Sequence, residues 1–301
     1  MERKVLVIDV GGSYIKYGLI DKECKISNKG KLKTPYLSQE HFLETLKELY
    51  IRFKDNISGI AISAPGLIDV EKGIMKTGGM LTYLDGIHLV DKLSKLCDNI
   101  SVSIENDAKA AALCEAWIGA GKDNNNIVSL TFGSRIGGGV VINRQIYRGN
   151  HLIAGEFSPI LCDFTPGSFK NFASEYSTIA VVNKVKERKY LDDLDGETVM
   201  KMYANNDTVV KEILNEWFES IAKFCINIDC LYNPDCICIG GGISANQLFM
   251  EKIYEYLDYV IKNAYVFRKP VVKSCQYHNN SNLIGAYYAY CQKYYKEGEN
   301  L

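Results

Sequence analysis

Residues 5–20 read VLVIDVGGSYIKYGLI, and this stretch decides the fold. The apolar run over residues 5–10 predicts a strand that stops at Gly11-Gly12, and the alternation over residues 14–20 predicts a second strand that returns beside it. Two glycines in such a turn let the backbone approach an anion closely, with N–H groups as donors. A plain glycine hairpin at a sheet edge remains the alternative for this motif taken alone.

Three polar side chains in the same stretch strengthen the interpretation as an anion site. Ser13 adds a hydroxyl group, Lys16 adds a positive charge, and Asp9 adds a carboxylate suited to Mg²⁺ or its bound waters. The spacing matches neither a P-loop nor a dinucleotide fingerprint, because no helix follows the glycines. The hairpin is therefore a candidate phosphate site of another kind.

Outside this hairpin, short apolar strands alternate with helical patterns, which predicts an α/β fold. Strands are predicted over residues 57–63, 101–104, 127–132, 140–142 and 236–239, and helices over residues 39–53, 107–117 and 247–261. The order of strand, glycines and returning strand near residue 5 recurs near residue 127. This recurrence indicates an internal duplication, although two hairpins can also arise independently.

The charges nearly cancel, because 35 Lys and Arg residues face 36 Asp and Glu residues among 301. No global field therefore favours nucleic acid or an anionic membrane. No run of 18 apolar residues is present, and the first apolar run is too short for an export signal. The ten cysteines are then expected to be reduced thiols in a cytoplasmic protein.

Two further glycine loops follow apolar strands. One comprises residues 133–139 and contains Gly133, Ser134 and Arg135, and the other is Gly240-Gly241-Gly242. Glycine-rich loops are costly in conformational entropy unless a tight turn or a ligand requires them. Three such loops at strand ends predict a nucleotide whose phosphates and adenosine are held from several sides.

Two acidic motifs are candidates for the chemistry. Asn106 and Asp107 lie where a strand meets a helix, so either residue can be a helix N-cap. The functional alternative is that Asp107 accepts a proton from a substrate hydroxyl group while Asn106 orients that group. Glu156, beside Gly155, is the weakest of these signals.

The sequence offers no convincing metal site built from cysteine or histidine. Cys236 and Cys238 alternate with isoleucines in an apolar strand, which predicts that both are buried as small hydrophobic side chains. The four histidines share no ligand spacing with the cysteines.

Taken in order, these motifs resemble the ROK family (repressors, open reading frames and kinases), whose enzymes are bacterial sugar kinases. The similar stretches are residues 9–21, 64–69, 105–108, 137–139, 154–156, 239–243 and 283–286. The resemblance covers about residues 5–290. The ordered set is specific, whereas no single member is.

The resemblance implies an α/β, two-lobed, actin-like ATPase fold of the duplicated ribonuclease H-like type, with the active site in a central cleft. We expect residues 1–117 plus 284–301 to form a smaller N-terminal lobe and residues 118–283 to form a larger C-terminal lobe. We also expect a homodimer that binds a small sugar and ATP but neither nucleic acid nor a membrane.

The family also implies a role for each motif. Asp107 is the general base, Asn106 and Glu156 hold sugar hydroxyl groups, and Asp9 serves Mg²⁺. Phosphates are cradled by Gly11, Gly12, Ser13, Lys16, Gly133 and Ser134, with Gly240, Gly241 and Gly242 near the adenosine. Gly78 and Gly79 lie in the sugar-recognition region, residues 77–86, which lacks the Asn and Trp usual in the family.

Two departures from the family pattern bear on function. Most members carry a zinc motif, but here Pro159 occupies the histidine position and only Cys162 appears in the segment that follows, so no zinc is expected. Arg135 replaces a glycine usual in the second phosphate loop. Its cation can pair with ATP or partly obstruct it.

Three functions compete at this point. The first is an ATP- and Mg²⁺-dependent kinase for the 6-hydroxyl group of a hexose or β-glucoside, with N-acetylmannosamine kinase or glucokinase as the alternatives. The second is a sugar-responsive repressor, which is disfavoured because the first strand begins at residue 5, where family repressors carry a helix-turn-helix domain. The third is a sugar-binding pseudo-enzyme, suggested by Arg135 and the missing zinc cluster.

Overall fold

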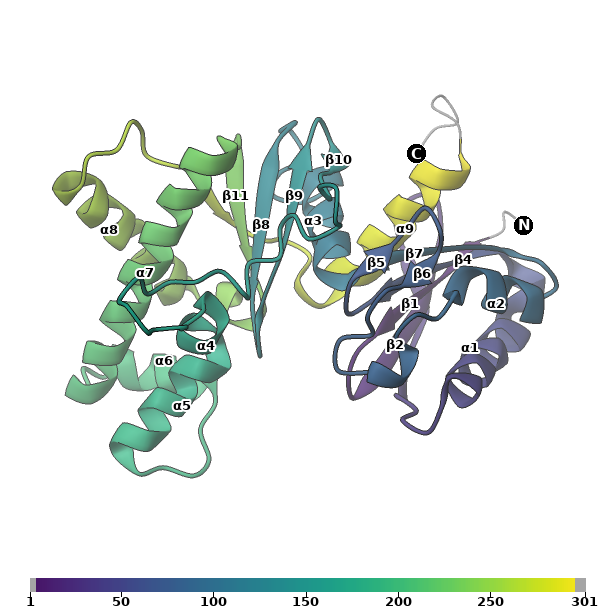
Figure 1. Ribbon diagram of the computed structural model, residues 1–301, viewed down its shortest axis with the longest axis horizontal. Helices are drawn as coiled ribbons and strands as arrows, with labels where there is room; N and C mark the ends of the chain where they lie inside the picture. Colours follow the sequence, from purple (N-terminus) through teal and green to yellow (C-terminus); the bar gives the residue numbers. More distant parts are fainter. Residues whose placement is uncertain (1–3, 296–301) are drawn as a thin grey trace. The chain divides into compact units, whose positions relative to one another are not determined.

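The computed structural model describes residues 4–295, and the chain divides into two compact units (Figure 1). Unit 1 comprises Met1–Trp117, Arg148–Ala154 and Asn280–Leu301, and unit 2 comprises Ile118–Tyr147 and Gly155–Asn279. Residues 148–154 and 280–283 thus join the part of the chain that the sequence assigns to the N-terminal lobe. Each unit contains one five-stranded sheet.

The sheet of unit 1 has the strand order β3-β2-β1-β4-β7. Its strands are β1 (Lys4–Val10), β2 (Tyr14–Ile20), β3 (Ile26–Lys33), β4 (Ile57–Ala64) and β7 (Ser101–Asn106). The first three strands pair antiparallel, and β1, β4 and β7 run parallel to one another. A two-stranded sheet pairs β5 (Ile68–Asp69) with β6 (Ile74–Met75).

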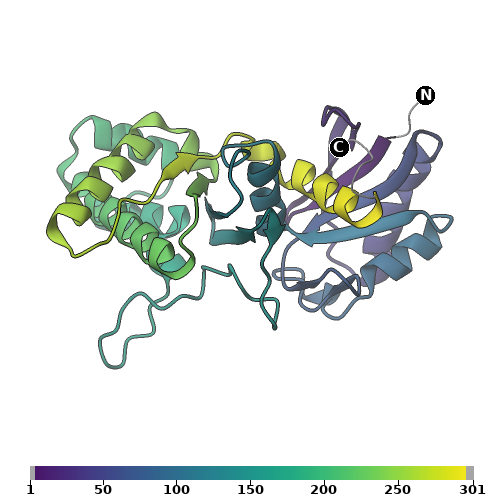
Figure 2. The same ribbon diagram turned by 90° about the horizontal axis from the view of Figure 1, so that it is seen from above.

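Helices cover both faces of this sheet (Figure 1, Figure 2). They are α1 (Gln39–Phe53), α2 (Leu89–Leu96), α3 (Asp107–Trp117) and α9 (Ser281–Tyr294), with short 3₁₀ turns at Lys54–Asn56, Thr82–Leu84 and His278–Asn280. The apolar stripe of α1 is buried in a core with Leu6, Ile8 and Val10 of β1. Because alternate residues of a strand face opposite sides, Val5, Val7 and Asp9 lie on the other face, where α9 packs.

Unit 2 repeats the pattern, with strand order β10-β9-β8-β11-β12. Its strands are β8 (Ile127–Phe132), β9 (Ile136–Ile142), β10 (Gln145–Ile146), β11 (Cys236–Gly240) and β12 (Val272–Ser274). Again the first three in chain order pair antiparallel, and β8, β11 and β12 run parallel. The predicted α/β fold is confirmed, and the matching strand order of the two sheets supports the predicted duplication.

The helices of unit 2 surround an aromatic core. They are α4 (Phe172–Tyr176), α5 (Thr178–Lys189), α6 (Gly196–Ala204), α7 (Thr208–Tyr232) and α8 (Gln247–Asn263), with a 3₁₀ turn at Gly242–Ala245. Trp217 and Phe218 of α7 pack against Phe249 of α8, and the indole N–H of Trp217 donates to the Tyr176 carbonyl oxygen at 2.7 Å. No element is predicted from the sequence between residues 157 and 235, so α4 to α7 come from the structure alone.

One predicted loop is wrong in part. The glycine-rich stretch 133–139 was expected to be a loop, but Gly137, Gly138 and Gly139 lie inside β9 and only residues 133–135 form the turn. Packing explains the glycines, because a Cβ atom at Gly138 would lie 2.1 Å from Cδ2 of Phe157. The glycine at position 138 therefore makes room for a buried ring.

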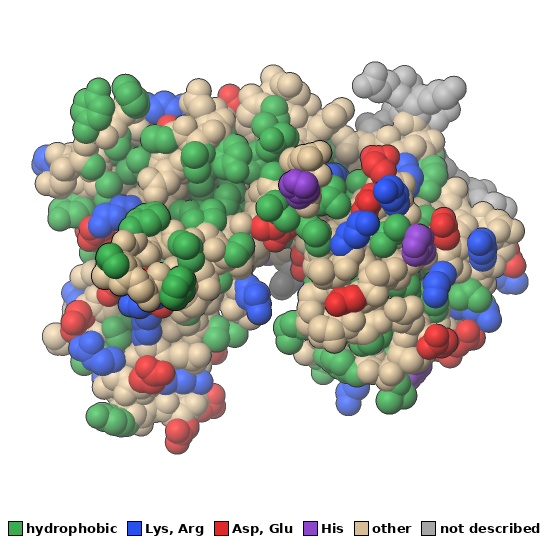
Figure 3. All heavy atoms as spheres, in the orientation of Figure 1, with side chains coloured by type: hydrophobic (Ala, Val, Ile, Leu, Met, Phe, Trp, Pro, Cys, Tyr) green, Lys and Arg blue, Asp and Glu red, His purple; other side chains and the backbone are tan. Residues whose placement is uncertain are grey.

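The surface carries charges of both signs. On the face drawn in Figure 3, basic and acidic side chains are interspersed without a continuous field of one sign. Within residues 4–295, no helix is long and apolar enough to cross a membrane. All ten cysteines are free, and Cys236 and Cys238 are buried in β11, as the alternation predicted.

Candidate active site

The register of unit 1 collects the predicted catalytic residues at one edge of its sheet. Asp9 of β1 pairs with Ser63 of β4, and Ser63 pairs in turn with Glu105 of β7. Because the three strands are parallel, their carboxyl ends meet at the same edge, where ligands bind in open α/β sheets. Asp9, Asn106 and Asp107 therefore lie at the same edge of the sheet.

Asp9 is a buried carboxylate that accepts two hydrogen bonds and lies beside one ammonium group. Its Oδ1 atom accepts hydrogen bonds from Ser63 Oγ and from Asn282 Nδ2, each at 3.0 Å. Its Oδ2 atom lies 3.9 Å from the Lys16 ammonium group. A carboxylate fixed in this way can meet the waters of Mg²⁺, which is usually held by one or two carboxylates together with substrate phosphates. The donor set thus fits a magnesium ion that arrives with a nucleotide.

The first glycine turn is braced from the side of β3. The Gly11 N–H donates to the Tyr14 carbonyl oxygen at 3.0 Å, and a Cβ atom at Gly11 would lie 2.9 Å from that oxygen. Thr34 makes two hydrogen bonds to the turn: its hydroxyl group donates to Gly11 O at 2.6 Å, and its N–H donates to Ser13 O at 3.1 Å. Gly12 and exposed Ser13 are left at the tip of a rigid turn.

Asn106 caps α3, as the N-cap prediction from the sequence proposed for this residue. Its Oδ1 atom accepts from the Lys109 N–H at 3.0 Å, and its Nδ2 group donates to Gly66 O at 2.9 Å. One amide hydrogen has no part in these two bonds and can still meet a substrate. Asp107 begins α3, and its Oδ1 atom accepts from the Ala108 N–H at 2.8 Å.

Gly66 lies between Asn106 and the predicted recognition loop, residues 77–86: it accepts a hydrogen bond from Asn106 and packs against Thr77. Gly66 has φ +94°, and a Cβ atom there would lie only 2.0 Å from the Thr77 carbonyl oxygen. A side chain at this position would push the two segments apart. Asp85 closes the loop by accepting from the Gly78 N–H at 2.6 Å. Unit 1 therefore brings Gly78 and Gly79 to the same region as Asn106.

In unit 2 the two remaining glycine turns are neighbours. Gly133 and Ser134 form the β8–β9 turn, and Gly240 to Gly242 follow the adjacent parallel strand β11. Gly241 has φ +94°, and a Cβ atom there would lie 2.0 Å from the carbonyl oxygen of Phe132, the residue that precedes Gly133. Nothing lies within 4 Å of a Cβ atom built at Gly242, so the backbone there is open to a ligand.

Glu156 also belongs to unit 2, in the turn that follows Gly155. Gly155 has φ +81°, and a Cβ atom added to it would lie 3.2 Å from Cα of Gly139. Phe157, on the other side, is buried in the core of unit 2. These two neighbours fix the backbone at half-buried Glu156.

Hydrogen bonds organise the segment that follows Pro159, where the resemblance to the family lacks the zinc cluster. Residues 161–171 form a projecting loop (Figure 2), closed by the Cys162 N–H, which donates to Lys170 O at 3.0 Å. Asp163 accepts from the Thr165 N–H and the Ser168 hydroxyl group, and the first of these bonds is the main reason that its pKa falls to about 2. Among residues 4–295, no group of three or more His, Cys, Asp or Glu side chains is placed to hold a metal ion.

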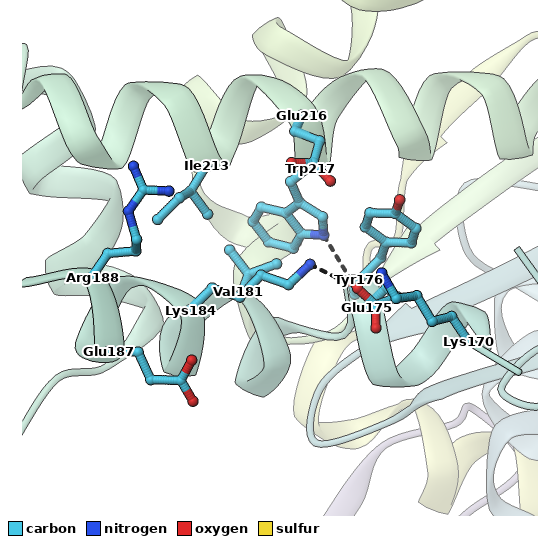
Figure 4. Close-up of a pocket in the computed structure, with 10 residues that line it drawn as sticks. All are labelled: Lys170, Glu175, Tyr176, Val181, Lys184, Glu187, Arg188, Ile213, Glu216 and Trp217. Atoms are coloured by element: carbon cyan, nitrogen blue, oxygen red, sulfur yellow. Dashed lines mark hydrogen bonds and ion pairs between the residues drawn. The ribbon is translucent and has the colours of Figure 1, made fainter. Parts of the chain in front are cut away.

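A cavity of about 360 Å³ lies elsewhere in unit 2, between α4, α5 and α7 (Figure 4). Lys184 lies at 3.1 Å from Glu175 in this cavity, and the indole of Trp217 forms part of its wall. Its lining mixes acidic and basic side chains and includes none of the predicted site residues. We assign it no role in the reaction.

Several residues that support the site carried no signal in the sequence. Ser63 and Asn282 hold Asp9, Thr34 holds the first glycine turn, and Asp85 closes the recognition loop. Each acts on a residue distant in the chain or across a loop, so no local motif marks it. The pairing of a buried Asp with hydroxyl and amide donors could be recognised only once strand register was known.

Comparison with known proteins identifies relatives of the whole chain. The ROK family model matches residues 5–293. A β-glucoside kinase of Listeria monocytogenes is 27% identical over 296 residues, which cover 96% of this chain and 98% of that protein.

Solved structures of similar proteins share this fold. A ROK family protein from Streptococcus pneumoniae, in complex with sucrose, superposes with a TM-score of 0.88 at 29% identity and covers 96% of this chain and 98% of its own. A Listeria monocytogenes protein proposed to be an N-acetylmannosamine kinase gives a TM-score of 0.86 at 26% identity. The match covers 96% of this chain and 99% of that protein.

Proposed function

The chain belongs to the ROK family, as one of its sugar kinases. We propose that it transfers the terminal phosphoryl group of ATP to the 6-hydroxyl group of a hexose or β-glucoside. One observation carries the proposal: unit 1 gathers Asp9, Asn106 and Asp107 at the carboxyl edge of one sheet, with Lys16 beside Asp9. This set offers a proton acceptor, a hydroxyl-orienting amide and a charge pair for phosphate.

In the proposed reaction, the sugar 6-oxygen attacks the terminal phosphorus atom of ATP. A new P–O bond forms, the bond to the β-phosphate oxygen breaks, and ADP leaves. Asp107 accepts the hydroxyl proton, and an ordinary carboxylate is basic enough because the transferring group is metaphosphate-like and the proton leaves late. Most of the acceleration then comes from positioning.

The geometry of each unit supports the ligand-binding roles that we propose. Gly11, Gly12, Ser13 and Lys16 are proposed to contact phosphates from the turn braced by Thr34. Gly133 and Ser134 are proposed to contact phosphates in unit 2, and Gly240, Gly241 and Gly242 to lie near the adenosine. Asp9 is proposed to orient Mg²⁺ through its waters, and that ion supplies charge neutralisation for the phosphates.

A β-glucoside is the substrate that we favour. The Listeria monocytogenes relative is a β-glucoside kinase, and the Streptococcus pneumoniae structure holds a disaccharide. Asn106 and Glu156 supply a donor–acceptor and an acceptor for the ring hydroxyl groups. Pro159 removes a side chain that other members place near the sugar, and Gly78 and Gly79 keep the recognition loop small, which leaves room for a group on the anomeric carbon.

N-acetylmannosamine is the second candidate, because the same space admits an N-acetyl group and one similar structure is proposed to be a kinase for that sugar. A coupled assay for ADP decides between them, with cellobiose, an aryl β-glucoside, glucose, N-acetylmannosamine and N-acetylglucosamine as acceptors. We expect kcat/KM to be highest for a β-glucoside. A ten-fold preference for N-acetylmannosamine over every β-glucoside would reject this choice, and ATP turnover with none of the sugars would favour the pseudo-enzyme.

A further inference from the structure

An ion pair with a buried carboxylate lies two residues before the proposed general base. Arg148 donates two hydrogen bonds to Glu105, from Nη1 to Oε1 at 2.8 Å and from Nη2 to Oε2 at 2.5 Å. Glu105 is only 1% exposed. Two parallel charge-assisted bonds fix both the distance and the orientation of the two side chains. Glu105 is two residues from Asp107, and none of the roles assigned above uses it.

The Glu105 carboxylate also fixes the backbone at the start of α3. Its Oε1 atom accepts from the Asn106 N–H at 2.8 Å, so the atom that receives Arg148 also holds the Glu105–Asn106 peptide group, one residue before Asp107. The side chain of Asn106 is held in turn by Lys109 and Gly66. A movement of Glu105 would therefore shift the peptide that positions Asp107.

Arg148 stands at the base of a closed loop. The Ala154 N–H donates to the Arg148 carbonyl oxygen at 3.1 Å, which ties the two ends of segment 148–154 together. Gly149, with φ +67°, allows the turn to start immediately after Arg148. The chain continues from Ala154 into Gly155 and Glu156, the second proposed sugar ligand. Within unit 1, the ion pair thus links the start of α3 to segment 148–154.

We propose that Arg148 is a positioning residue for phosphoryl transfer: through Glu105 it holds Asn106 and Asp107 in the geometry that the sugar hydroxyl group requires. This inference rests on the proposed function. A merely structural ion pair would stabilise the fold without affecting the chemistry, because a buried carboxylate needs a partner in either case. The two possibilities differ in what happens when the charge of both partners is removed.

The test compares Arg148→Gln with the double variant Glu105→Gln/Arg148→Gln. In the single variant a buried carboxylate loses its cation, so both thermal stability and kcat/KM for the sugar should fall, the latter about 100-fold. In the double variant no unpaired charge remains, so Tm should return to within a few degrees of the parent. We expect kcat/KM for the sugar to stay at least ten-fold low, with KM for ATP within two-fold of the parent.

Arg188→Gln is the matched control, because Arg188 forms an exposed ion pair with Glu212 at 3.0 Å. It should change neither Tm nor kinetics. Recovery of kcat/KM together with Tm in the double variant would reduce Arg148 to a stabilising role and overturn the proposal. So would parent-like kinetics in Arg148→Gln at a temperature where it is folded.

Hydrogen exchange separates failure of this inference from failure of the proposed function. Arg148→Gln should speed exchange in peptides covering residues 103–110 and 148–154, and Arg188→Gln should not. A parent protein that phosphorylates no sugar rejects the proposed function, whatever the exchange data show. Unchanged exchange in Arg148→Gln rejects the positioning role, whatever the parent phosphorylates.

Discussion

The Asn282 side-chain amide on the last helix donates to the Asp9 carboxylate on the first strand, with 3.0 Å between Nδ2 and Oδ1. Ser63 Oγ donates to the same oxygen. The residue proposed to meet Mg²⁺ is thus oriented by two donors from elsewhere in unit 1, and Lys16 flanks its other oxygen.

Replacing Asn282 with Ala should weaken the use of MgATP. A hydrogen bond to a charged group contributes about 1.5–3 kcal/mol, which corresponds to about ten-fold or more in KM for MgATP. Steady-state kinetics with ATP varied at saturating sugar measures this effect. Asn263→Ala is the control, since that exposed amide donates to the Tyr259 carbonyl oxygen near the end of α8. Equal KM values for the two variants would show that Asn282 does not orient Asp9.

Asp107→Asn should abolish phosphoryl transfer and leave sugar binding intact. The substitution keeps the size of the side chain and its bond to the Ala108 N–H but removes the proton acceptor, so kcat should fall by at least ~10². Calorimetry should show sugar affinity within a few-fold of the parent. Asp195→Asn, a matched change at the N-cap of α6, should leave kcat unchanged. If the two variants behave alike, Asp107 serves only the start of its helix.

Gly241→Ala should destabilise unit 2 strongly. The substituted residue would have φ +94° and a Cβ atom 2.0 Å from the Phe132 carbonyl oxygen, which must move. Strained backbone and steric overlap together cost about 3 kcal/mol or more. Thermal unfolding of Gly242→Ala gives the comparison, because nothing lies within 4 Å of a Cβ atom there, and its Tm should change little. A Tm for Gly241→Ala equal to that of Gly242→Ala would contradict the geometry of this turn.

The purified protein should contain no stoichiometric zinc. Pro159 occupies the position of the histidine ligand, and Cys162 is held by a hydrogen bond to Lys170 O within a loop that Asp163 organises. Activity should survive EDTA once Mg²⁺ is restored, because no structural zinc is removed. Elemental analysis that finds one tightly held zinc ion per chain would reject this prediction.

The sequence was most informative where a pattern is local. The apolar positions 42, 43, 46, 49, 50 and 53 predicted the buried face of α1, and the structure confirms both the helix and its face. The hairpin at Gly11-Gly12 and the helix over residues 107–117 are confirmed for the same reason. In each case periodicity or turn chemistry within a few residues specifies the structure.

The sequence failed where the cause is distant in the chain. The sequence predicts that Gly138 lies in a glycine-rich loop, but it lies in a strand and makes room for the ring of Phe157, 19 residues away. Arg148 carried no signal, because its partner Glu105 lies 43 residues earlier. The catalytic role of Asp107 and the contacts of Glu156 with a sugar remain proposals, since a capped helix start and a glycine turn explain the same residues without a ligand.

The position of α9 affects how the protein folds during synthesis. The last strand of the unit 1 sheet ends at Asn106, yet the helix that covers one face of that sheet begins only at Ser281. At about 5–20 residues per second, the ribosome takes about 10–35 s to make the intervening residues. For that time Val5 and Val7 lack their final cover, so this face of the sheet can be completed only after α9 has been synthesised.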